Sequence, residues 1–246
     1  MKILFSPSET KNSGGVDKRF DKDSFIFPEL FEKRMEIVNQ YNNFIKNASK
    51  DELSKILGTK KEDVLSQYSK DIFETPTMKV IQRYEGVAFD YLEYNNLDEN
   101  DKTYIDENVL IFSNLFGVLK AGDVGLPDYK LKQGETFNNL KIEKFYMDNF
   151  SSKIDEYLEN EDIIDLRAGF YEKFYKINKP YVTMKFIKDG KVVSHWAKAY
   201  RGIILKLLAK NSIKTIEELM NMEIENLSIE EIKKQKNKTE IIYNIK

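Results

Sequence analysis

The sequence predicts a mixed α+β protein whose 246 residues form a single domain, residues 1–246. Hydrophobic residues make up 41% of the chain and aromatic residues 13%, which is enough to fill a sizeable core. Short apolar runs of strand length are scattered among segments with helical spacing, without the regular alternation of a βαβ protein. No repeat, linker or low-complexity segment divides the chain. We therefore expect one mixed sheet with peripheral helices.

In the first half of the chain, one predicted strand is followed by several predicted helices. Ile3-Leu4-Phe5 predicts a buried strand that ends at a polar loop. Apolar residues three or four apart predict helices over 30–44, 51–57, 64–68, 76–84 and 87–94. Gly58 fits a helix C-cap, and Thr59 with Glu62 fits a capping box that opens the next helix. Six acids against one lysine make 91–108 a solvated surface.

In the second half of the chain, a β-hairpin is the clearest local prediction. Asp189-Gly190 suits a type I′ turn, and it joins two β-rich runs at 181–188 and 191–196. An apolar run over 109–116 has the length of a strand or a short helix, and the glycine-punctuated segment 117–127 that follows it reads as a loop. Further helices are expected over 145–158, 171–175, 200–208 and 215–220, and further strands over 163–166 and 240–243.

The cysteine and histidine counts exclude several classes of chemistry. The chain has no Cys, so it can form neither a disulfide nor a protein-bound iron–sulfur cluster, and it has no thiol switch. The lone histidine, His195, alternates with Ser194 and Trp196 on the predicted second hairpin strand, where a packed or surface role is favoured over catalysis. We expect no metal, no cofactor and no assigned catalytic residue. No run approaches a membrane span, and the first apolar run is too short for a signal peptide, so we expect a cytoplasmic protein with no membrane partner.

Charge is unevenly distributed although the totals nearly cancel, 39 basic against 41 acidic residues. Between positions 179 and 210 we count eight basic residues and one acid, or +7, which leaves −9 for the rest of the chain. A solvated hairpin and helix would explain this pattern. Clustered cations also bind polyanions, because they displace counterions from phosphates.

Two local patterns favour phosphate binding. Lys198 and Arg201 lie three apart and share a helix face, close to the predicted helix start, and Gly202 beside them would allow close backbone approach. Lys60 and Lys61 sit at the turn of the helix–Gly–helix segment 51–68, where a helix-hairpin-helix would contact DNA phosphates. A plain αα-hairpin has the same sequence pattern, so both readings stay open here.

Four segments carry a recurring pattern in a fixed order. They are Ser6-Pro7-Ser8-Glu9-Thr10; Asn114-Leu115-Phe116-Gly117-Val118-Leu119-Lys120 with Asp123 and Pro127-Asp128-Tyr129-Lys130-Leu131; Leu166-Arg167-Ala168-Gly169-Phe170-Tyr171; and Ser194-His195-Trp196-Ala197-Lys198-Ala199-Tyr200-Arg201-Gly202. Together they resemble the motifs of the YaaA family, the peroxide stress protein family, over nearly the whole chain.

The resemblance implies a mixed α/β domain with a positively charged cleft, a helix-hairpin-helix element, and DNA binding without sequence preference. It also implies a role in limiting peroxide damage through lower free iron. Glu9 departs from the family's Lys, although Lys11 follows two residues on. Other departures are Lys120-Ala121-Gly122 for Arg-Pro-x, an inserted Asp128, Lys130 and Lys132 for Arg and Glu, and Arg167-Ala168-Gly169-Phe170, which lacks a Ser and a Glu. Lysine keeps the charge of arginine but loses its bidentate geometry.

Three functions remain open from the sequence. The first is an oxidative-stress protein that contacts duplex or branched DNA through phosphates, with anion contacts at Lys198, Arg201, Lys120, Lys130, Lys60 and Lys61. The second is an enzyme acting on a nucleotide-like or phosphorylated small molecule, for which Ser6, Thr10, Asp123, Tyr129 and Lys198 should converge on one enclosed pocket. The third is an iron-binding or docking protein, which the Cys and His counts disfavour.

Overall fold

The computed structural model describes the backbone of residues 1–246 and all side chains except those of Ser194 and His195. Its main element is an 8-stranded sheet of order β4-β3-β1-β6-β7-β10-β9, with β8 paired to β7, and β2 and β5 form a second small sheet. The strands are β1 (Lys2–Phe5), β2 (Thr77–Met78), β3 (Val109–Ser113), β4 (Gly117–Lys120), β5 (Leu126–Pro127), β6 (Ile163–Asp165), β7 (Tyr181–Lys188), β8 (Lys191–Val192), β9 (Leu227–Gln235) and β10 (Lys238–Ile245). The predicted mixed sheet is confirmed.

The centre of the sheet is parallel and its two edges are antiparallel. Strands β3, β1, β6, β7 and β10 run parallel to one another, while β4 and β9 run antiparallel to β3 and β10. Central parallel strands are covered on both faces, and Ile3, Leu4 and Phe5 are accordingly at most 1% exposed. Strand β1 pairs with β3 on one side and β6 on the other. The strands that follow β1 in sequence are added first on the β3 side and then, from β6 on, on the opposite side, so the strand order reverses at β1.

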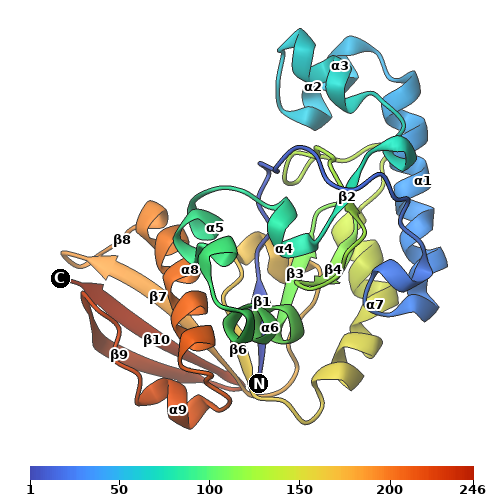
Figure 1. Ribbon diagram of the computed structural model, residues 1–246. Coiled ribbons are helices and arrows are strands. Elements are labelled where there is room, and N and C mark those ends of the chain that lie inside the picture. The colour runs from blue at the N-terminus through green and yellow to red at the C-terminus, as the bar shows by residue number, and fades with distance from the viewer.

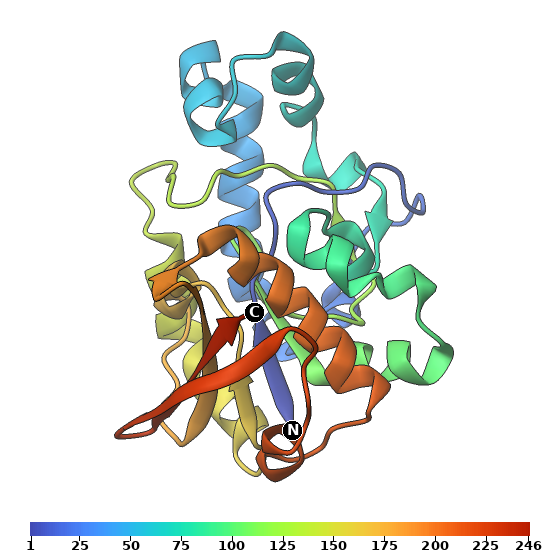
Figure 2. The same ribbon diagram turned by 90° about the vertical axis from the view of Figure 1, so that its left-hand side faces the viewer.

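Helices lie on both faces of the sheet, with α5, α6 and α8 on one face and α1 and α7 on the other (Figures 1 and 2). They are α1 (Phe31–Asn47), α2 (Lys50–Leu57), α3 (Glu62–Tyr68), α4 (Val80–Arg83), α5 (Val87–Leu92), α6 (Glu99–Asn108), α7 (Ile142–Leu158), α8 (Ser194–Lys210) and α9 (Ile216–Met220), with 3₁₀ turns η1 (Lys22–Ser24), η2 (Pro28–Leu30), η3 (Ile72–Glu74), η4 (Tyr94–Asn96) and η5 (Gly169–Lys173). Helices α2 and α3 project beyond the body of the molecule (Figure 1). None of the described helices combines the length and the apolar character needed to cross a bilayer.

The predicted hairpin is confirmed, but its second strand is shorter than expected. Asp189 and Gly190 have φ values of 51° and 72°, as a type I′ turn requires, and Lys188 pairs with Lys191. Strand β8 ends at Val192 because α8 begins at Ser194, so the prediction that 194–196 form a strand is wrong. The side chain of His195 lies outside the described residues.

The segment 117–127 is also more regular than expected. Its first residues form β4, which pairs with β3, and Leu126–Pro127 form β5. Gly117 has a φ of 68°, and a Cβ there would lie 2.3 Å from the ring of Tyr146 on α7. The position needs glycine both for its backbone conformation and for this close contact.

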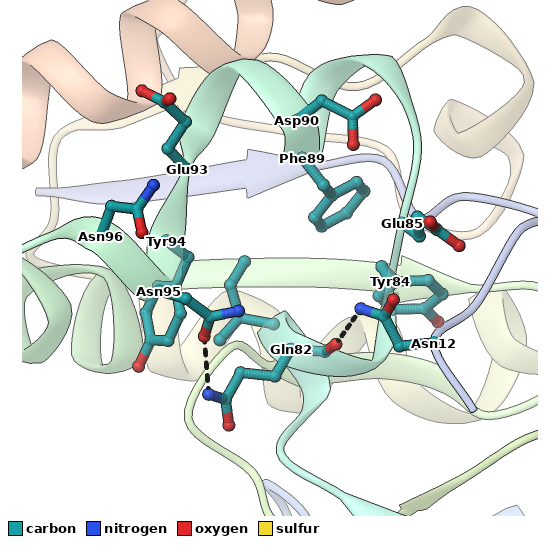
Figure 3. A pocket seen from close by; sticks show the side chains of 11 residues that line it. Asn12, Gln82, Tyr84, Glu85, Phe89, Asp90, Glu93, Tyr94, Asn95 and Asn96 are labelled. Atoms are coloured by element: carbon teal, nitrogen blue, oxygen red, sulfur yellow. Dashed lines mark hydrogen bonds between the residues drawn. The ribbon is translucent and has the colours of Figure 1, made fainter. Parts of the chain in front are cut away.

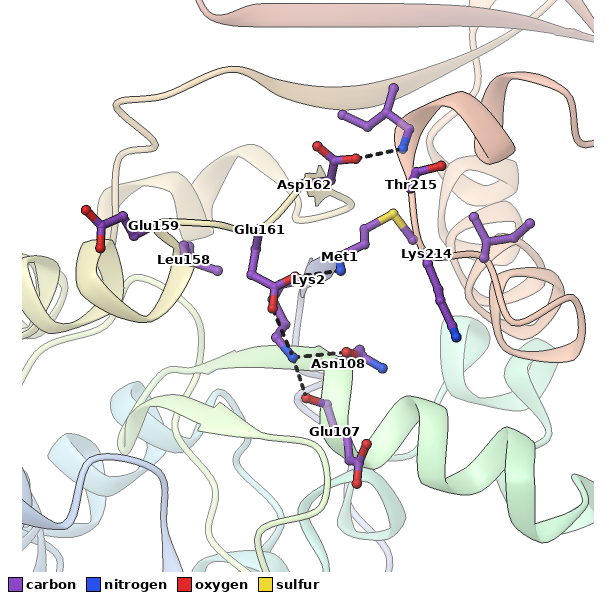
Figure 4. A network of polar contacts seen from close by, with 12 residues as sticks. Met1, Lys2, Glu107, Asn108, Leu158, Glu159, Glu161, Asp162, Lys214 and Thr215 are labelled. Carbon is purple, nitrogen blue, oxygen red and sulfur yellow. Dashed lines mark hydrogen bonds and ion pairs between the residues drawn. The ribbon is translucent and has the colours of Figure 1, made fainter.

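A polar network fixes the amino-terminal end of β1 (Figure 4). The carboxyl end of this strand, where the loop 6–10 begins, is at the opposite end of the sheet. The amino group of Met1 lies 2.5 Å from a carboxylate oxygen of Glu161, in the loop after α7. Lys2 donates to Asn108 Oδ1 at 3.0 Å, at the end of α6. Strand β1 is thereby held between these two helices, which fixes the start of the loop that follows it.

Candidate anion-binding pocket

A pocket of about 380 Å³ opens at the carboxyl ends of β1 and β6. The loop after β1 forms one wall, the loop after β6 a second, and α5 with the preceding Gly86, α8 and Gln133 form the remainder. The lining residues are Phe5, Ser6, Pro7, Ser8, Glu9, Thr10, Gly86, Val87, Ala88, Phe89, Gln133, Ala168, Tyr171, Lys198 and Arg201. Open α/β sheets bind ligands outside the carboxyl ends of their strands, at the point where the strand order reverses. The pocket occupies that point.

Two cations of α8 face the pocket. Lys198 is exposed, and Arg201 lies one helical turn along the same helix face. Burial lowers the pKa of Arg201, and the nearby carboxylate of Asp165 partly offsets this effect, so the guanidinium stays charged. Neither side chain forms a hydrogen bond or an ion pair with the side chains that the structure describes. Two cations on one wall, with no partner among the described side chains, make this pocket the candidate anion site.

The carboxylate that acts on Arg201, Asp165, is already neutralised. Asp165, the last residue of β6, accepts from Arg167 Nε and Nη2, each at 2.8 Å. Arg167 also donates to the carbonyls of Tyr171 and Tyr175, at 3.2 and 3.0 Å. The ion pair is buried, with the two side chains 1% and 7% exposed. Arg167 therefore cancels the charge that would otherwise hold Arg201 and fixes the loop that carries Tyr171.

The loop after β1 is held by its own hydrogen bonds. Ser6 Oγ accepts from the backbone N–H of Ala168 at 2.7 Å, which ties the two strand-end loops together. Glu9 Oε1 accepts from the N–H of Gln133 at 2.9 Å. The wall formed by the loop after β1, which carries the hydroxyls of Ser6, Ser8 and Thr10, is thus held in place. Its carboxylate, Glu9, accepts from a backbone N–H.

Gly202 serves helix packing rather than ligand approach. A Cβ at this position would lie 2.0 Å from the carbonyl oxygen of Ala88 on α5. Helices α5 and α8 therefore cross with their backbones in contact, and both carry pocket residues. The sequence interpretation that Gly202 admits a phosphate is wrong, because α5 occupies the space.

We expect Gly202→Ala to destabilise the protein by about 1–3 kcal/mol, since an added methyl group must separate two packed helices. Urea unfolding followed by circular dichroism measures the change. Gly169→Ala is the matched control, because the nearest atom to its new Cβ would be 3.8 Å away. Equal stability of the two variants would contradict the crossing.

The other predicted cations lie outside the pocket. Lys120 pairs with Leu110, near the amino-terminal end of β3. It therefore lies at the amino-terminal ends of the parallel strands, whereas the pocket lies at their carboxyl ends. The backbone carbonyl of Lys130 accepts from Tyr41 Oη at 2.7 Å. The exposed Lys60 and Lys61 lie between α2 and α3. None of these four lysines forms an ion pair with a described side chain, but Lys120 cannot share a ligand with α8.

The α2–α3 turn is built differently from the prediction in one respect. Gly58 has a φ of 65° and caps α2, as expected. Lys61 is the N-cap of α3, and Thr59 Oγ1 accepts from the N–H of Lys61 rather than from that of Glu62, so the predicted capping box is wrong.

One loop connects this turn to the pocket. The N–H of Lys132 donates to the carbonyl of Ile56 at 2.8 Å, and the side chain of Lys132 packs on Gly58. The next residue, Gln133, lines the pocket and binds Glu9. Sequence reasoning missed Gln133, since nothing in its local pattern marks it.

Several motif positions are structural. Asp123 Oδ2 accepts from the N–H groups of Lys120 and Ile26, at 2.8 and 2.9 Å. Tyr129 Oη lies 2.6 Å from Ser113 Oγ inside the core, and Pro127 belongs to β5. The structure therefore brings Ser6, Pro7, Thr10, Lys198 and Arg201 to one pocket but places Asp123, Tyr129, Pro127 and Gly117 elsewhere. The side chain of Ser194 lies outside the described residues.

The buried carboxyl of Asp123 predicts a pH-dependent stability. Burial raises its pKa to about 6, above an ordinary value of about 3.9. Its contribution to stability is thus fully present below about pH 4 and is lost as the pH rises through 6. Asp123→Asn keeps the acceptor oxygen and does not titrate. Relative to the parent, this variant should gain up to about 3 kcal/mol between pH 4 and 7. A constant difference in urea stability across that range would contradict the assignment.

Lys11 does not replace the family's lysine in the pocket. Its ammonium lies 4.0 Å from the ring centre of Tyr129 and 5.4 Å from that of Tyr84. Burial lowers its pKa to about 7, with Asp128 and Glu9 acting in the opposite direction. The side chain is held among aromatic rings beside the pocket. Lys11, which follows Glu9 by two residues, is therefore not among the residues that line the pocket.

A second pocket, of about 450 Å³, lies on the other side of Phe89 (Figure 3). Its rim carries three carboxylates, Glu85, Asp90 and Glu93, and no lysine or arginine is among its lining residues. Among the described side chains, Glu93 of these three forms an ion pair, with Lys206. This charge disfavours anions, in contrast to the pocket that Lys198 and Arg201 line. Within the described part of the chain, no three His, Asp or Glu side chains are grouped to hold a metal ion.

The fold is that of an α/β protein, and the pocket, its candidate anion site, lies at the reversal point of the sheet. The family described as Peroxide stress protein YaaA matches residues 1–233, and the chain belongs to this family. It is 50% identical over 245 residues to an uncharacterized protein of Campylobacter jejuni, covering 100% of this chain and 99% of the relative. It is 34% identical over 233 residues to a UPF0246 protein of Corynebacterium glutamicum, covering 90% and 91%. A UPF0246 protein of Fusobacterium nucleatum is 28% identical over 238 residues, covering 93% of each chain.

Proposed function

We propose that this protein acts in peroxide stress by binding DNA without sequence preference, with Lys198 and Arg201 as the main phosphate contact. One observation carries the proposal: both cations lie unpaired among the described side chains and line the same pocket as the loop after β1. Unpaired cations bind phosphates most favourably, because no internal ion pair must first be broken.

The size of the pocket determines how DNA would bind. A volume of about 380 Å³ accommodates a phosphate with its sugar, whereas a duplex is too wide to enter. The duplex would lie across the mouth with one phosphate directed at Arg201. Lys60 and Lys61 are exposed in the turn between α2 and α3, where they can contact a second stretch of backbone. Contacts of this kind position DNA without reading bases.

Phosphate binding also gives a physical route to protection from iron. Ferrous ions can act as counterions of DNA phosphates. There each gives one electron to hydrogen peroxide, whose O–O bond breaks into a hydroxide ion and a hydroxyl radical, and ferric iron remains. Lysine and arginine displace counterions from the phosphates that they neutralise. Bound protein would therefore lower the amount of iron held on DNA. With no Cys in the chain, protection acts through DNA or iron rather than a thiol.

A salt titration tests the function. We expect the logarithm of the affinity for a labelled duplex of about 20 base pairs, roughly two turns, to fall linearly with the logarithm of salt concentration. The slope should lie between about −2 for Lys198 and Arg201 alone and −4 with Lys60 and Lys61. Duplexes of different sequence should bind equally. No measurable binding at low salt, or a strong sequence preference, would refute the proposal.

A phosphorylated small molecule is the second candidate ligand. The observation that favours it is that Ser6, Thr10, Lys198 and Arg201 line one pocket, which is part of what the enzyme hypothesis requires. Asp123 and Tyr129 do not join them. Isothermal titration with a nucleoside monophosphate separates the candidates. Micromolar binding that competes with DNA only weakly would favour the small molecule.

A further inference from the structure

Strand β9 is the outer strand of the main sheet and pairs with β10 alone. Its nine residues, Leu227–Gln235, present an unpaired backbone edge, and Figure 2 looks onto the β9–β10 hairpin, with no other element drawn over it. An edge of this length is a template for pairing with another strand. Apart from Leu227 and Ser228, every residue of β9 is exposed.

Two apolar rows cross the sheet and end at this edge. One row runs from Met184 through Ile241 to Ile232, and the exposed fractions along it are 8%, 0% and 40%. The other runs from Phe186 through Tyr243 to Ile229, with 1%, 4% and 45% exposed. Residues opposite each other in a ladder share a face. Each row is therefore buried as far as β10 and exposed only at β9, where a further strand would cover it.

The charges of β9 are self-complementary. Its central residues read Glu230-Glu231-Ile232-Lys233-Lys234. When two copies of this strand pair antiparallel with Ile232 facing Ile232, each Glu231 faces Lys233 of the second copy and each Glu230 faces Lys234. Opposite charges that face each other across strands stabilise the pairing. No register centred on a lysine or a glutamate gives this match, because like charges then meet at the axis.

We propose that β9 is a homodimer interface, in which two copies of this chain join their sheets edge to edge about a two-fold axis at Ile232. The axis is perpendicular to the sheet, so both copies of Ile229 and Ile232 lie on one face and continue the apolar rows. Such an isologous contact closes on itself and does not propagate into a fibre. This interface is separate from the pocket and does not depend on DNA binding.

The usual protection of an edge strand is only partly present in β9. Lysines and β-bulges normally prevent edge pairing, since a second copy would bring like charges together. In β9 each lysine meets a glutamate instead. The bulge lies at Glu230, which has no partner in β10, whereas Glu231 and Ile232 pair in regular register. Within each copy Glu231 and Lys233 already form an ion pair at 3.1 Å, so in the dimer they exchange this internal partner for one across the axis. These pairs therefore set the register of the two strands rather than adding two wholly new contacts.

Charge-swap variants test this interface by sedimentation velocity on the full chain. The parent should associate from 28.9 kDa to twice that mass as its concentration rises. Glu230→Lys/Glu231→Lys and Lys233→Glu/Lys234→Glu should each weaken the dimer at least about tenfold, because four attractive pairs become repulsive. An equimolar mixture of these two variants should form a heterodimer. The variant with all four substitutions should dimerise as the parent does, since its pattern is again self-complementary.

Asp17→Lys/Asp90→Lys is the control for Glu230→Lys/Glu231→Lys, because it adds the same positive charge at two exposed carboxylates that form no ion pair with the described side chains. It should dimerise like the parent. Circular dichroism of each variant shows whether it is folded, and rescue in the mixture shows that each half is intact. A parent that stays monomeric up to its solubility limit overturns the proposal. A dimer that neither half-swap weakens overturns it as well.

Discussion

The double charge reversal Lys198→Glu/Arg201→Glu is expected to weaken DNA binding at least about a hundredfold near 0.1 M salt. Each charge-assisted hydrogen bond contributes about 1.5–3 kcal/mol, so losing two already accounts for that factor. Reversal adds repulsion from the phosphate. The salt dependence should also become shallower by about 2 in slope, because two fewer counterions are released. Fluorescence anisotropy at several salt concentrations measures both quantities.

The control for this reversal lies at the other end of the same region. Lys210→Glu/Lys214→Glu changes the net charge equally, and both lysines are exposed at and beyond the carboxyl end of α8. Since α8 rises about 1.5 Å per residue, Lys210 is roughly 18 Å from Lys198. The control should bind DNA within about threefold of the parent. Equal losses in the two variants would mean that only total charge matters and that the pocket is not the contact.

Arg167→Met is expected to destabilise the protein by about 3–5 kcal/mol, because it leaves the buried carboxylate of Asp165 without a partner. The variant also loses the donors to two backbone carbonyls of the loop that lines the pocket. The freed Asp165 would attract Arg201, so DNA affinity should fall in the molecules that stay folded. Urea unfolding gives the free energy of unfolding. Fluorescence anisotropy, measured without urea at a temperature at which the variant is folded, gives the affinity for DNA.

A second substitution separates the charge effect from the packing effect. Asp165→Asn in the Arg167→Met background removes the unpaired charge. It keeps an acceptor for the backbone N–H of residue 167, which in the parent donates to Asp165 Oδ1 at 3.0 Å. The double variant should recover most of the lost stability, since neutral replacements of a buried ion pair are often tolerated. A parent-like stability of Arg167→Met alone would contradict the role given to this pair.

The parts of the fold that were predicted correctly have strong local signals. Ile3-Leu4-Phe5 is apolar throughout, as central parallel strands are, and the Asp189-Gly190 turn has the backbone angles that its residues favour. Lys198 and Arg201 were predicted as a pair because helical spacing fixes their common face. The prediction that they lie close to Ser6 and Thr10 came from the family resemblance. No local spacing in the sequence relates the loop after β1 to α8.

The parts that were missed depend on tertiary contacts. Strand β9 was not predicted, because its paired glutamates and lysines give neither an alternating nor an apolar run. Helix α6 was read only as a solvated surface, since Ile105 and Asp101 are its only buried residues. Gly202 was assigned to ligand approach because the sequence cannot show that Ala88 lies against it. Lys120 was placed in the site for its charge. Because β4 is antiparallel to β3, however, Lys120 lies at the amino-terminal end of β3, away from the pocket.

The most direct test of the central claim is the Arg201 side-chain Nε–Hε signal in a ¹H–¹⁵N NMR titration with short duplex DNA. The signal is assigned by its absence in Arg201→Lys. We expect it to shift, saturate at the affinity measured by anisotropy, and return when salt releases the DNA, because a phosphate then accepts from the guanidinium. An Arg201 signal that stays unchanged while DNA binds would contradict the account.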